Sequence, residues 1–239
     1  LGWICIGIAV FMAVVFLIFE NKITNPVFDV RLIMRNRVFA FSCIAALINY
    51  SATSAIGFFI SLYLQYLKGL DARTAGLIMI SQPIVMTLIS PVAGKLSDRR
   101  NPGVIASIGM GIIASGLILL CFIRESTPEY FIVLLLLLMG IGFGLFSSPN
   151  SNAIMSSVEK RYLGIASGVV GTMRMVGQMM SMGIAMMLIS LYIGKQTINP
   201  ATYPGLISSM RTGFVIFSIL SVFGIFASLA RHEKSEKST

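Results

Sequence analysis

The stretch GKLSDRRNPG (Gly94–Gly103) is a short polar loop between two long apolar segments, 72–95 and 103–123. Its first glycine allows two helices to approach closely, and its aspartate can cap a helix or accept a hydrogen bond from arginine. Its basic residues suit the anionic surface of a membrane. From the residues alone two interpretations stay open: a tight turn that carries positive charge, or a latch that makes the two helices move as one.

Seven apolar segments run through the chain, and each is long enough to cross a hydrocarbon core of ~30 Å as a helix. The composition agrees, with 239 residues of which 56% are hydrophobic and 11% charged, and with a mean hydropathy of +0.88. The alternation typical of membrane β-barrels is absent, so we predict an all-α membrane protein. The predicted spans are 1–19, 38–66, 72–95, 103–123, 130–156, 163–193 and 209–230.

The basic residues gather in alternate loops. Of the 18 Lys and Arg, 12 lie in 20–37, 94–102, 157–162 and 231–239, and 5 lie in the opposite loops. The positive-inside rule then predicts a cell-membrane protein with the N-terminus of this chain outside and its C-terminus in the cytoplasm. The formal charge of +9 reflects this topology, so we expect the lipid bilayer as a partner and no nucleic acid.

The chain divides into one additional span and a unit of six. Asn25-Pro26 breaks the helix after span 1–19, and residues 20–37 are predicted to form a cytoplasmic linker. Residues 38–230 hold six spans with short connections, which predicts a compact six-helix bundle, and 231–239 form a cytoplasmic tail. The chain begins with Leu and its first segment lacks a basic leader and a cleavage site. We therefore expect 1–19 to be a true span in a chain that has lost its beginning.

Groups that bind metals or perform catalysis are scarce. Cys5, Cys43 and Cys121 lie within apolar segments without metal-ligand spacing, and His232 is alone in the tail. Clustered Asp, His or Ser-Lys groups are also missing. We expect no metal site, no cofactor and no enzymatic activity.

Glycines and prolines mark the unusual helices. Pro83 and Pro91 each allow a bend in span 72–95. Glycines and one proline in the spans 130–156 and 163–193 predict close helix packing, with helix bending as a further role. These residues are Gly140, Gly142, Gly144, Pro149, Gly164, Gly168, Gly171 and Gly177.

Polar side chains inside the spans are the candidates for lining a substrate cavity: Asn49, Tyr50, Gln82, Asn150, Asn152, Arg174 and Gln178. The alternative for the amides is hydrogen bonding between helices. The run MRMVGQMMSMGIAMM (Met173–Met187) is either a deformable apolar surface suited to varied substrates or ordinary packing. Arg174 and Gln178 are four residues apart and therefore share a helix face.

Arg174 lies about eleven residues, or ~16 Å, into its span. An unpaired charge at that depth costs ~2.5–3.5 kcal/mol on insertion scales, so a partner is expected. The candidates are carbonyls freed by Pro149, the amides of Asn150 and Asn152, the carboxylate of Asp98, cavity water, or a group outside this chain. Both a structural pairing and a role in substrate or proton handling stay open.

The loop Gly94–Gly103 resembles the motif of the major facilitator superfamily usually written G-x-L-a-D-r-x-G-r-k. The matching residues are Gly94, Leu96, Asp98 and Arg99, with Ser97 at the small position; Asn101 replaces the glycine, and Pro102-Gly103 replaces the basic pair. The resemblance implies a conformational-gating motif formed by Gly94, Leu96, Asp98, Arg99 and Arg100. Its place, between the second and third of six spans, matches the copy in the second half of that superfamily.

A longer stretch, GIGFGLFSSPNSNAIMSSVEKRYLGIASGVVGTMRMVGQMMSMGIA (Gly140–Ala185), resembles the late part of fourteen-span drug:proton antiporters of the EmrB/QacA type. The linker NPVFDVRLIMRNRVF (25–39) is similar to theirs as well. The resemblance implies that 1–19 is a middle linker helix and that 38–230 is the C-terminal six-helix half of a major facilitator fold. An N-terminal half would then be missing.

No acidic residue lies at the middle of a span; the nine are Glu20, Asp29, Asp71, Asp98, Glu125, Glu129, Glu159, Glu233 and Glu236. A proton-coupled carrier needs a titratable group within the membrane, and in the family the coupling carboxylates belong mainly to the first half. We expect this chain on its own to show no proton-driven transport.

The predicted function is that of one half of a secondary transporter that exports drugs or other amphipathic or cationic compounds against protons by alternating access. Its partners would be a small-molecule substrate, protons and the missing half. An alternative is a nutrient or metabolite carrier of the same superfamily. A more distant alternative is a seven-span receptor, although the exterior disulfide and the basic-aromatic signature of such receptors are missing.

Overall fold

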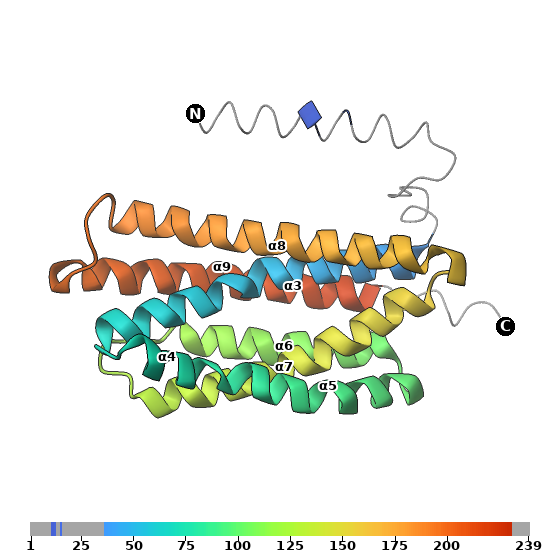
Figure 1. Cartoon of the computed structure of the whole chain (residues 1–239), viewed down its shortest axis with the longest axis horizontal. Coiled ribbons are helices and arrows are strands. Elements are labelled where there is room, and N and C mark those ends of the chain that lie inside the picture. Colours follow the sequence, from blue (N-terminus) through green and yellow to red (C-terminus); the bar gives the residue numbers. More distant parts are fainter. Residues whose placement is uncertain (1–10, 13–14, 16–35, 231–239) are drawn as a thin grey trace.

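A computed structural model describes residues 11–12, 15 and 36–230 of the chain (Figure 1). Within residues 36–230 every regular element is a helix, and six helical stretches are long and apolar enough to cross a membrane, which confirms the all-α membrane fold. The predicted span 1–19, the linker 20–37 and the tail 231–239 fall almost wholly outside the described residues. The elements are α3 (Arg37–Leu62), the π-helix η1 (Tyr63–Leu67), α4 (Ala72–Met79), α5 (Ser81–Arg99), α6 (Pro102–Leu120), α7 (Glu129–Ser156), the 3-10 turn η2 (Lys160–Tyr162), α8 (Leu163–Tyr192), the 3-10 turn η3 (Pro200–Thr202) and α9 (Tyr203–Ala230).

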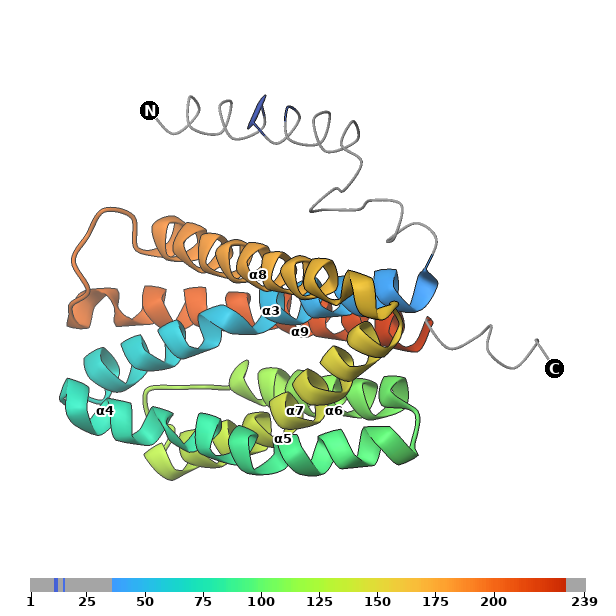
Figure 2. The ribbon, with the colours of Figure 1, turned by 45° about the vertical axis from the view of Figure 1, so that its right-hand side comes forward.

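The long helices lie in two layers along the same axis, one of α3, α8 and α9 and the other of α5, α6 and α7 (Figures 1 and 2). If α4 and α5 are taken as one span, the chain consists of two successive sets of three spans. The first span of each set packs on the second and third spans of the other set: α3 on α8 and α9, and α7 on α5 and α6. Contacts between α6 and α9 join the layers. The bundle is therefore built from two three-helix repeats, each of which packs its first helix against the other repeat.

The second described span is interrupted at Ile80, between α4 and α5. Pro83 has no backbone N–H to donate to the carbonyl four residues earlier, so the regular ladder is lost at this point. Pro91 lies inside α5, which continues to Arg99. Asp71 caps α4, and a hydrogen bond from the Thr74 side chain lowers the pKa of its carboxyl group.

The last span begins earlier than predicted, at Tyr203 instead of residue 209. The side chain of Asn199 accepts hydrogen bonds from the backbone N–H groups of Ala201 and Thr202, and Pro200 occupies the first turn, so the chain is already helical there. Capping of this kind fixes a helix start independently of hydropathy. The apolar run alone placed the boundary two turns too late.

The glycines of α7 allow it to lie between α5 and α6. A Cβ built on Gly140 would lie 2.6 Å from the main-chain oxygen of Gln82, and one on Gly144 would lie 2.8 Å from Ile89 Cβ, both on α5. A Cβ on Gly142 would lie 2.9 Å from the Gly109 carbonyl oxygen on α6. At 3.6 residues per turn, positions 140 and 144 share a face and 142 points the opposite way. The GIGFG run thus serves two interfaces.

Three side chains hold the loop between α6 and α7 by hydrogen bonds to its carbonyl groups. The Tyr63 hydroxyl donates to the carbonyl oxygens of Arg124 and Thr127 at 2.8 and 3.2 Å. Lys68 Nζ donates to the Glu125 carbonyl, and Arg211 donates from Nε and Nη2 to the Ile123 carbonyl at 2.9 and 2.7 Å. At this end of the bundle the loop between α6 and α7 is therefore held by η1, Lys68 and α9.

Candidate functional site

The two spans that the chain buries least lie at the edges of one side of the bundle. Of the residues in the most apolar window of Ala72–Arg99, 6% are buried, and for Lys160–Tyr192 the value is 22%, against 39 to 61% in the other four spans. Both views place α8 and α5 at opposite edges of this side, with α3 and α7 crossing between them (Figures 1 and 2). We call the side formed by α8, α3, α7 and α5 the open face.

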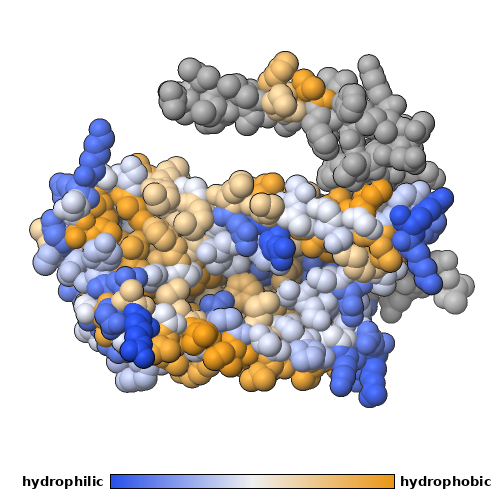
Figure 3. Space-filling view, viewed as in Figure 1, coloured by the Kyte–Doolittle hydropathy of each residue, from blue (hydrophilic) through white to orange (hydrophobic). Residues whose placement is uncertain are grey.

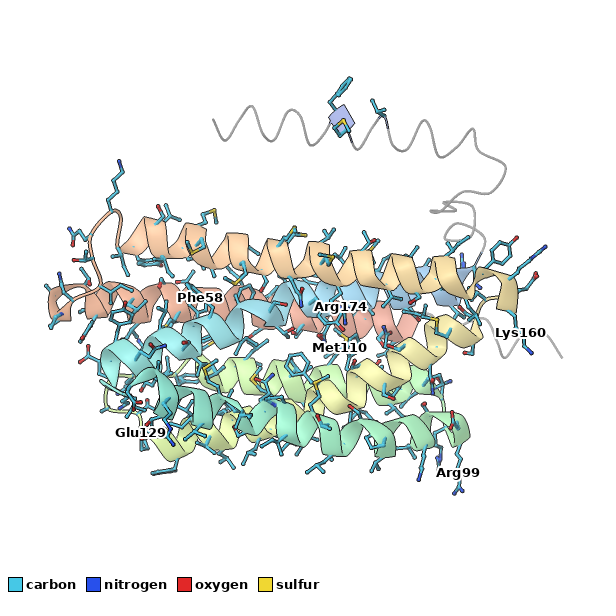
Figure 4. The ribbon with its side chains drawn as sticks, viewed as in Figure 1. Phe58, Arg99, Met110, Glu129, Lys160 and Arg174 are labelled. Carbon is cyan, nitrogen blue, oxygen red and sulfur yellow. The ribbon has the colours of Figure 1, made fainter. Side chains whose placement is uncertain are left out.

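Arg174 lies midway along the open face. Figure 4 shows it on α8 at the centre of the long axis, far from Arg99 and Lys160 at one end and from Glu129 at the other. In the same view the surface is hydrophilic at this point and mostly pale or apolar around it (Figure 3). Arg174 and Gln178 are both exposed, as their shared helix face predicts. A charge therefore lies about eleven residues, ~16 Å, from the first residue of α8.

Arg174 makes no hydrogen bond or ion pair with any other residue that the structure describes. The partners expected from the sequence are engaged elsewhere: Asn150 Nδ2 donates to the Ser42 carbonyl at 3.2 Å, and Asn152 Nδ2 donates to Ser97 and Asp98. Unpaired charge at this depth is costly, and intramembrane charges typically face a cavity or a partner. The open face accordingly offers a guanidinium with its hydrogen-bond donors available.

The position of Arg174 is fixed by a close crossing of α8 over α3. A Cβ built on Gly177 would lie 2.8 Å from the Leu47 carbonyl oxygen and 2.8 Å from Tyr50 Cβ. One turn further, the Ser181 hydroxyl accepts a hydrogen bond from the Ala55 N–H at 2.9 Å. Because residues 177 and 181 point at α3, residues 174 and 178 lie beside that contact, at the edge of α8. Sequence reasoning missed Ser181, although it continues a buried Gly-x-x-x-Ser-x-x-x-Ala stripe that ends at residue 185.

The two candidate residues on α3, Asn49 and Tyr50, lie in different surroundings. Tyr50 is half-buried beneath Gly177 and so lies next to α8. Asn49 is only 1% exposed, its Oδ1 accepts from Thr53 Oγ1 at 3.5 Å, and its Nδ2 has no hydrogen-bond partner among the described residues. The cavity-lining role expected for Asn49 does not match this position, because the rotation of α3 turns the side chain into the bundle.

The remaining amides lie at helix contacts. Gln82 is half-buried where α5 meets Gly140 of α7. Asn150 is 3% exposed and joins α7 to α3 through Ser42. Asn150 thus forms a hydrogen bond between helices, which was the alternative role for the amide side chains, and it does not lie on the exposed surface of the open face.

The loop motif for which the sequence predicts a gating role is held against α7 at the end of the bundle. Asn152 Nδ2 donates to Ser97 Oγ at 3.0 Å and to Asp98 Oδ1 at 3.4 Å. A Cβ on Gly94 would meet Ser148 Oγ at 3.0 Å, so this glycine permits the approach of the two helices. Leu96, Arg99 and Arg100 are exposed, and Asn101 caps α6 by accepting from the Gly103 N–H at 2.9 Å. Asn152 was expected in a cavity; its contacts place it with the motif.

Several glycines of α8 lack the helix contact that was expected of them. Cβ atoms built on Gly164, Gly168 and Gly171 would meet no atom within 4 Å among the described residues. The nearby methionines are equally uncovered, with Met175, Met179 and Met187 between 55 and 69% exposed. Only Gly177 of this helix makes the predicted close contact. The glycine-rich and methionine-rich side of α8 is thus free in this bundle.

The bundle has six membrane-spanning helices in two three-helix repeats, and each repeat packs its first helix against the other. Polar side chains lie at mid-depth. This is the architecture of secondary transporters. The sequence profile described as Major Facilitator Superfamily matches residues 1–182 and, in a second overlapping match, residues 43–239. The chain therefore belongs to the Major Facilitator Superfamily and is a multi-pass membrane protein.

Its curated relatives have several transport roles. The chain is 30% identical over 155 residues to the riboflavin transporter RibZ of Clostridioides difficile, covering 65% of this chain and 34% of that protein. It is 31% identical over 159 residues to the uncharacterized transporter YebQ of Escherichia coli, covering 66% and 34%. It is 25% identical over 153 residues to the multidrug efflux pump LfrA of Mycolicibacterium smegmatis, covering 64% and 30%. The chain thus aligns with about a third of the length of each.

Proposed function

We propose that the chain forms one six-helix half of a proton-coupled secondary transporter that exports drugs or other amphipathic or cationic compounds by alternating access. The observation that carries this proposal is Arg174, a charge without a described partner at mid-depth of the open face. In transporters built from repeats, the substrate and coupling-ion sites lie near the bilayer midplane between the two halves. Family membership favours this carrier over the seven-span receptor.

The companion half would cover the open face. Large apolar side chains are exposed on α5 and α8 at its edges, including Leu88 at 66%, Val92 at 61% and Met179 at 69%, as a contact between two halves requires. Arg174 would then face the companion across a central cavity. Its preferred partner there is a carboxylate, because a guanidinium fork matches carboxylate geometry.

Proton coupling would follow from that pairing. Among the described spans no carboxylate lies at mid-depth, since Asp98 and Glu129 are near opposite ends of the bundle. A carboxylate of the companion half, held ionised by Arg174, would release the guanidinium when it binds a proton or when a cationic substrate takes its place. Competition of this kind makes proton entry and substrate exit mutually dependent.

The gating motif would act at the cytoplasmic end. Lys95, Arg99, Arg100, Lys160 and Arg161 lie at the helix ends that the positive-inside rule assigns to the cytoplasm. Asn152 ties the motif aspartate to α7, so α5, α6 and α7 would move together during the transition. In the proposed orientation the N-terminus of the chain would lie outside and its C-terminus in the cytoplasm.

The substrate class rests on the surface of α8. The exposed methionines of that helix provide a flexible, polarizable apolar surface, which suits varied amphipathic compounds. The multidrug efflux pump LfrA supports the same class. The riboflavin transporter RibZ, which is more similar to this chain, keeps a nutrient or metabolite carrier as the alternative.

The test is a proton-flux assay on the intact protein in liposomes with an imposed proton gradient. The panel holds cationic drugs, neutral amphipathic compounds and riboflavin. We expect proton movement that depends on the cationic or amphipathic compounds. Flux with riboflavin alone would favour the nutrient carrier, and no flux with any proton gradient or compound would contradict proton-coupled transport.

A further inference from the structure

A groove of about 560 Å³ lies between α6 and α9, which take no part in the open face. Its wall includes Ile118 of α6, Phe122 of the turn that follows it, and Val215, Ile219, Val222 and Phe226 of α9. We propose that this groove binds one acyl chain of an anionic phospholipid, with the phosphate group beside Arg124 and Arg211. The proposal rests on the membrane-spanning fold and does not depend on the transported compound.

The length of the groove matches one leaflet of a bilayer. Along α9 its wall extends from Val215 to Phe226, which is eleven residues or ~16 Å. Half of a ~30 Å hydrocarbon core is ~15 Å. The groove starts beside Phe122, two residues after α6 ends, so an acyl chain in it would run from the end of that span toward the middle of the bundle.

The wall of the groove offers no polar partner. Its two side chains with polar atoms are Cys121 and Ser218, and both hydrogen bond within their own part of the chain. Cys121 Sγ donates to the Leu117 carbonyl at 3.3 Å, and Ser218 Oγ donates to the Phe214 carbonyl at 2.7 Å. The surrounding apolar side chains are open, for example Ile219 at 52% exposed. The groove therefore suits hydrocarbon better than a polar or charged substrate.

Two arginines lie close in sequence to the lining residues at the Phe122 end of the groove, outside its wall, and the loop there also carries Glu125. Arg124 follows Phe122 by two residues, is exposed, and its guanidinium has no hydrogen bond or ion pair with the described residues. Arg211 precedes Val215 by one helical turn, and its bonds to the Ile123 carbonyl use Nε and Nη2, leaving Nη1 available. Guanidinium groups bind phosphate through parallel hydrogen bonds. Basic charge near this end and an apolar wall together match a phospholipid.

The proposal is tested on the intact protein in liposomes of phosphatidylethanolamine and phosphatidylglycerol. A phosphatidylglycerol with a photoactivatable diazirine on one acyl chain is crosslinked, and the labelled peptides are mapped by mass spectrometry. We expect labelling concentrated on 118–122 and 215–226. Ile219→Trp, which fills the groove, should reduce that labelling at least about fivefold, whereas Ile108→Trp, at a position of α6 that is 54% exposed but outside the groove wall, should leave it unchanged.

The headgroup is tested with the same diazirine on phosphatidylethanolamine. Arg124→Gln should lower the preference for the phosphatidylglycerol probe about fivefold, the factor expected for one basic residue beside anionic headgroups. Equal labelling by both probes in the unaltered protein would overturn the anionic part of the proposal. Labelling spread evenly over exposed apolar positions and unaffected by Ile219→Trp, or crosslinks from the groove to another protein segment, would overturn the acyl-chain site.

Discussion

Replacing Gly140 by alanine should destabilise the bundle, because α5 and α7 meet there backbone to backbone. The new Cβ would lie 2.6 Å from the Gln82 carbonyl oxygen and 3.0 Å from Val85 Cβ. Since the first atom belongs to the main chain, α5 and α7 must separate by roughly 0.8 Å to restore ordinary contact. Overpacking of this kind costs ~1–3 kcal/mol, and the higher helix propensity of alanine offsets ~0.5–1 kcal/mol of that.

The contacted atom is main chain, which cannot move aside as a side chain can, so we take the upper part of that range, ~2–3 kcal/mol. The net loss is then ~1–2.5 kcal/mol, which corresponds to a fall in Tm of ~2–10 °C for a bundle of this size. Thermal unfolding in detergent can be followed with a thiol-reactive dye in a Cys5→Ala, Cys121→Ala background, because the remaining Cys43 is only 3% exposed and reacts when the bundle opens. Gly111→Ala on α6 is the matched control, since its Cβ would meet no atom within 4 Å. It should keep or raise Tm by ~1–4 °C. A Gly140→Ala protein as stable as the control would refute the role assigned to the glycine.

Three further outcomes are expected. In the intact protein, Asp98→Asn should impair transport and leave membrane insertion intact, and Asn152→Ala, which removes the amide beside Asp98, should act in the same direction; unchanged flux in both would reduce the motif to a turn. Tyr63→Phe should speed amide hydrogen exchange in the loop 121–128 about fivefold, because two carbonyl groups lose a hydrogen bond worth ~1 kcal/mol, and unchanged exchange would contradict the clamp. The 239-residue chain alone, in liposomes, should give no proton-driven transport, and substrate-dependent proton flux from it would show that no companion half is needed.

The spans could be predicted because the length of an apolar run nearly determines a membrane helix. Helix ends depend on local chemistry that hydropathy does not report. Asn199 and Pro200 start the last helix before its apolar run, and the missing N–H of Pro83 interrupts the second described span at Ile80, after α4 ends. The motif loop was visible as a polar interruption, but its contact with Asn152 depends on the packing of α7.

The candidate site was harder to predict because its composition depends on how each helix is rotated. Asn49 and Tyr50 are neighbours in sequence, yet one is turned into the bundle and the other lies against α8. Arg174 was recognisable as a charge in an apolar segment, and its shared face with Gln178 follows from helical spacing. Its exposure follows from the close crossing at Gly177, which no single sequence reveals.

The most direct test of this account is substrate-dependent proton flux through the intact protein with Arg174→Gln. The control is Arg161→Gln, which removes an exposed arginine whose only described ion pair is with Glu159, 2.9 Å away at the end of the bundle. If the open face lines the transport cavity, Arg174→Gln should reduce the flux by about tenfold or more at equal membrane insertion, and the control should keep it. Equal flux in the two variants would contradict the placement of the transport site at Arg174.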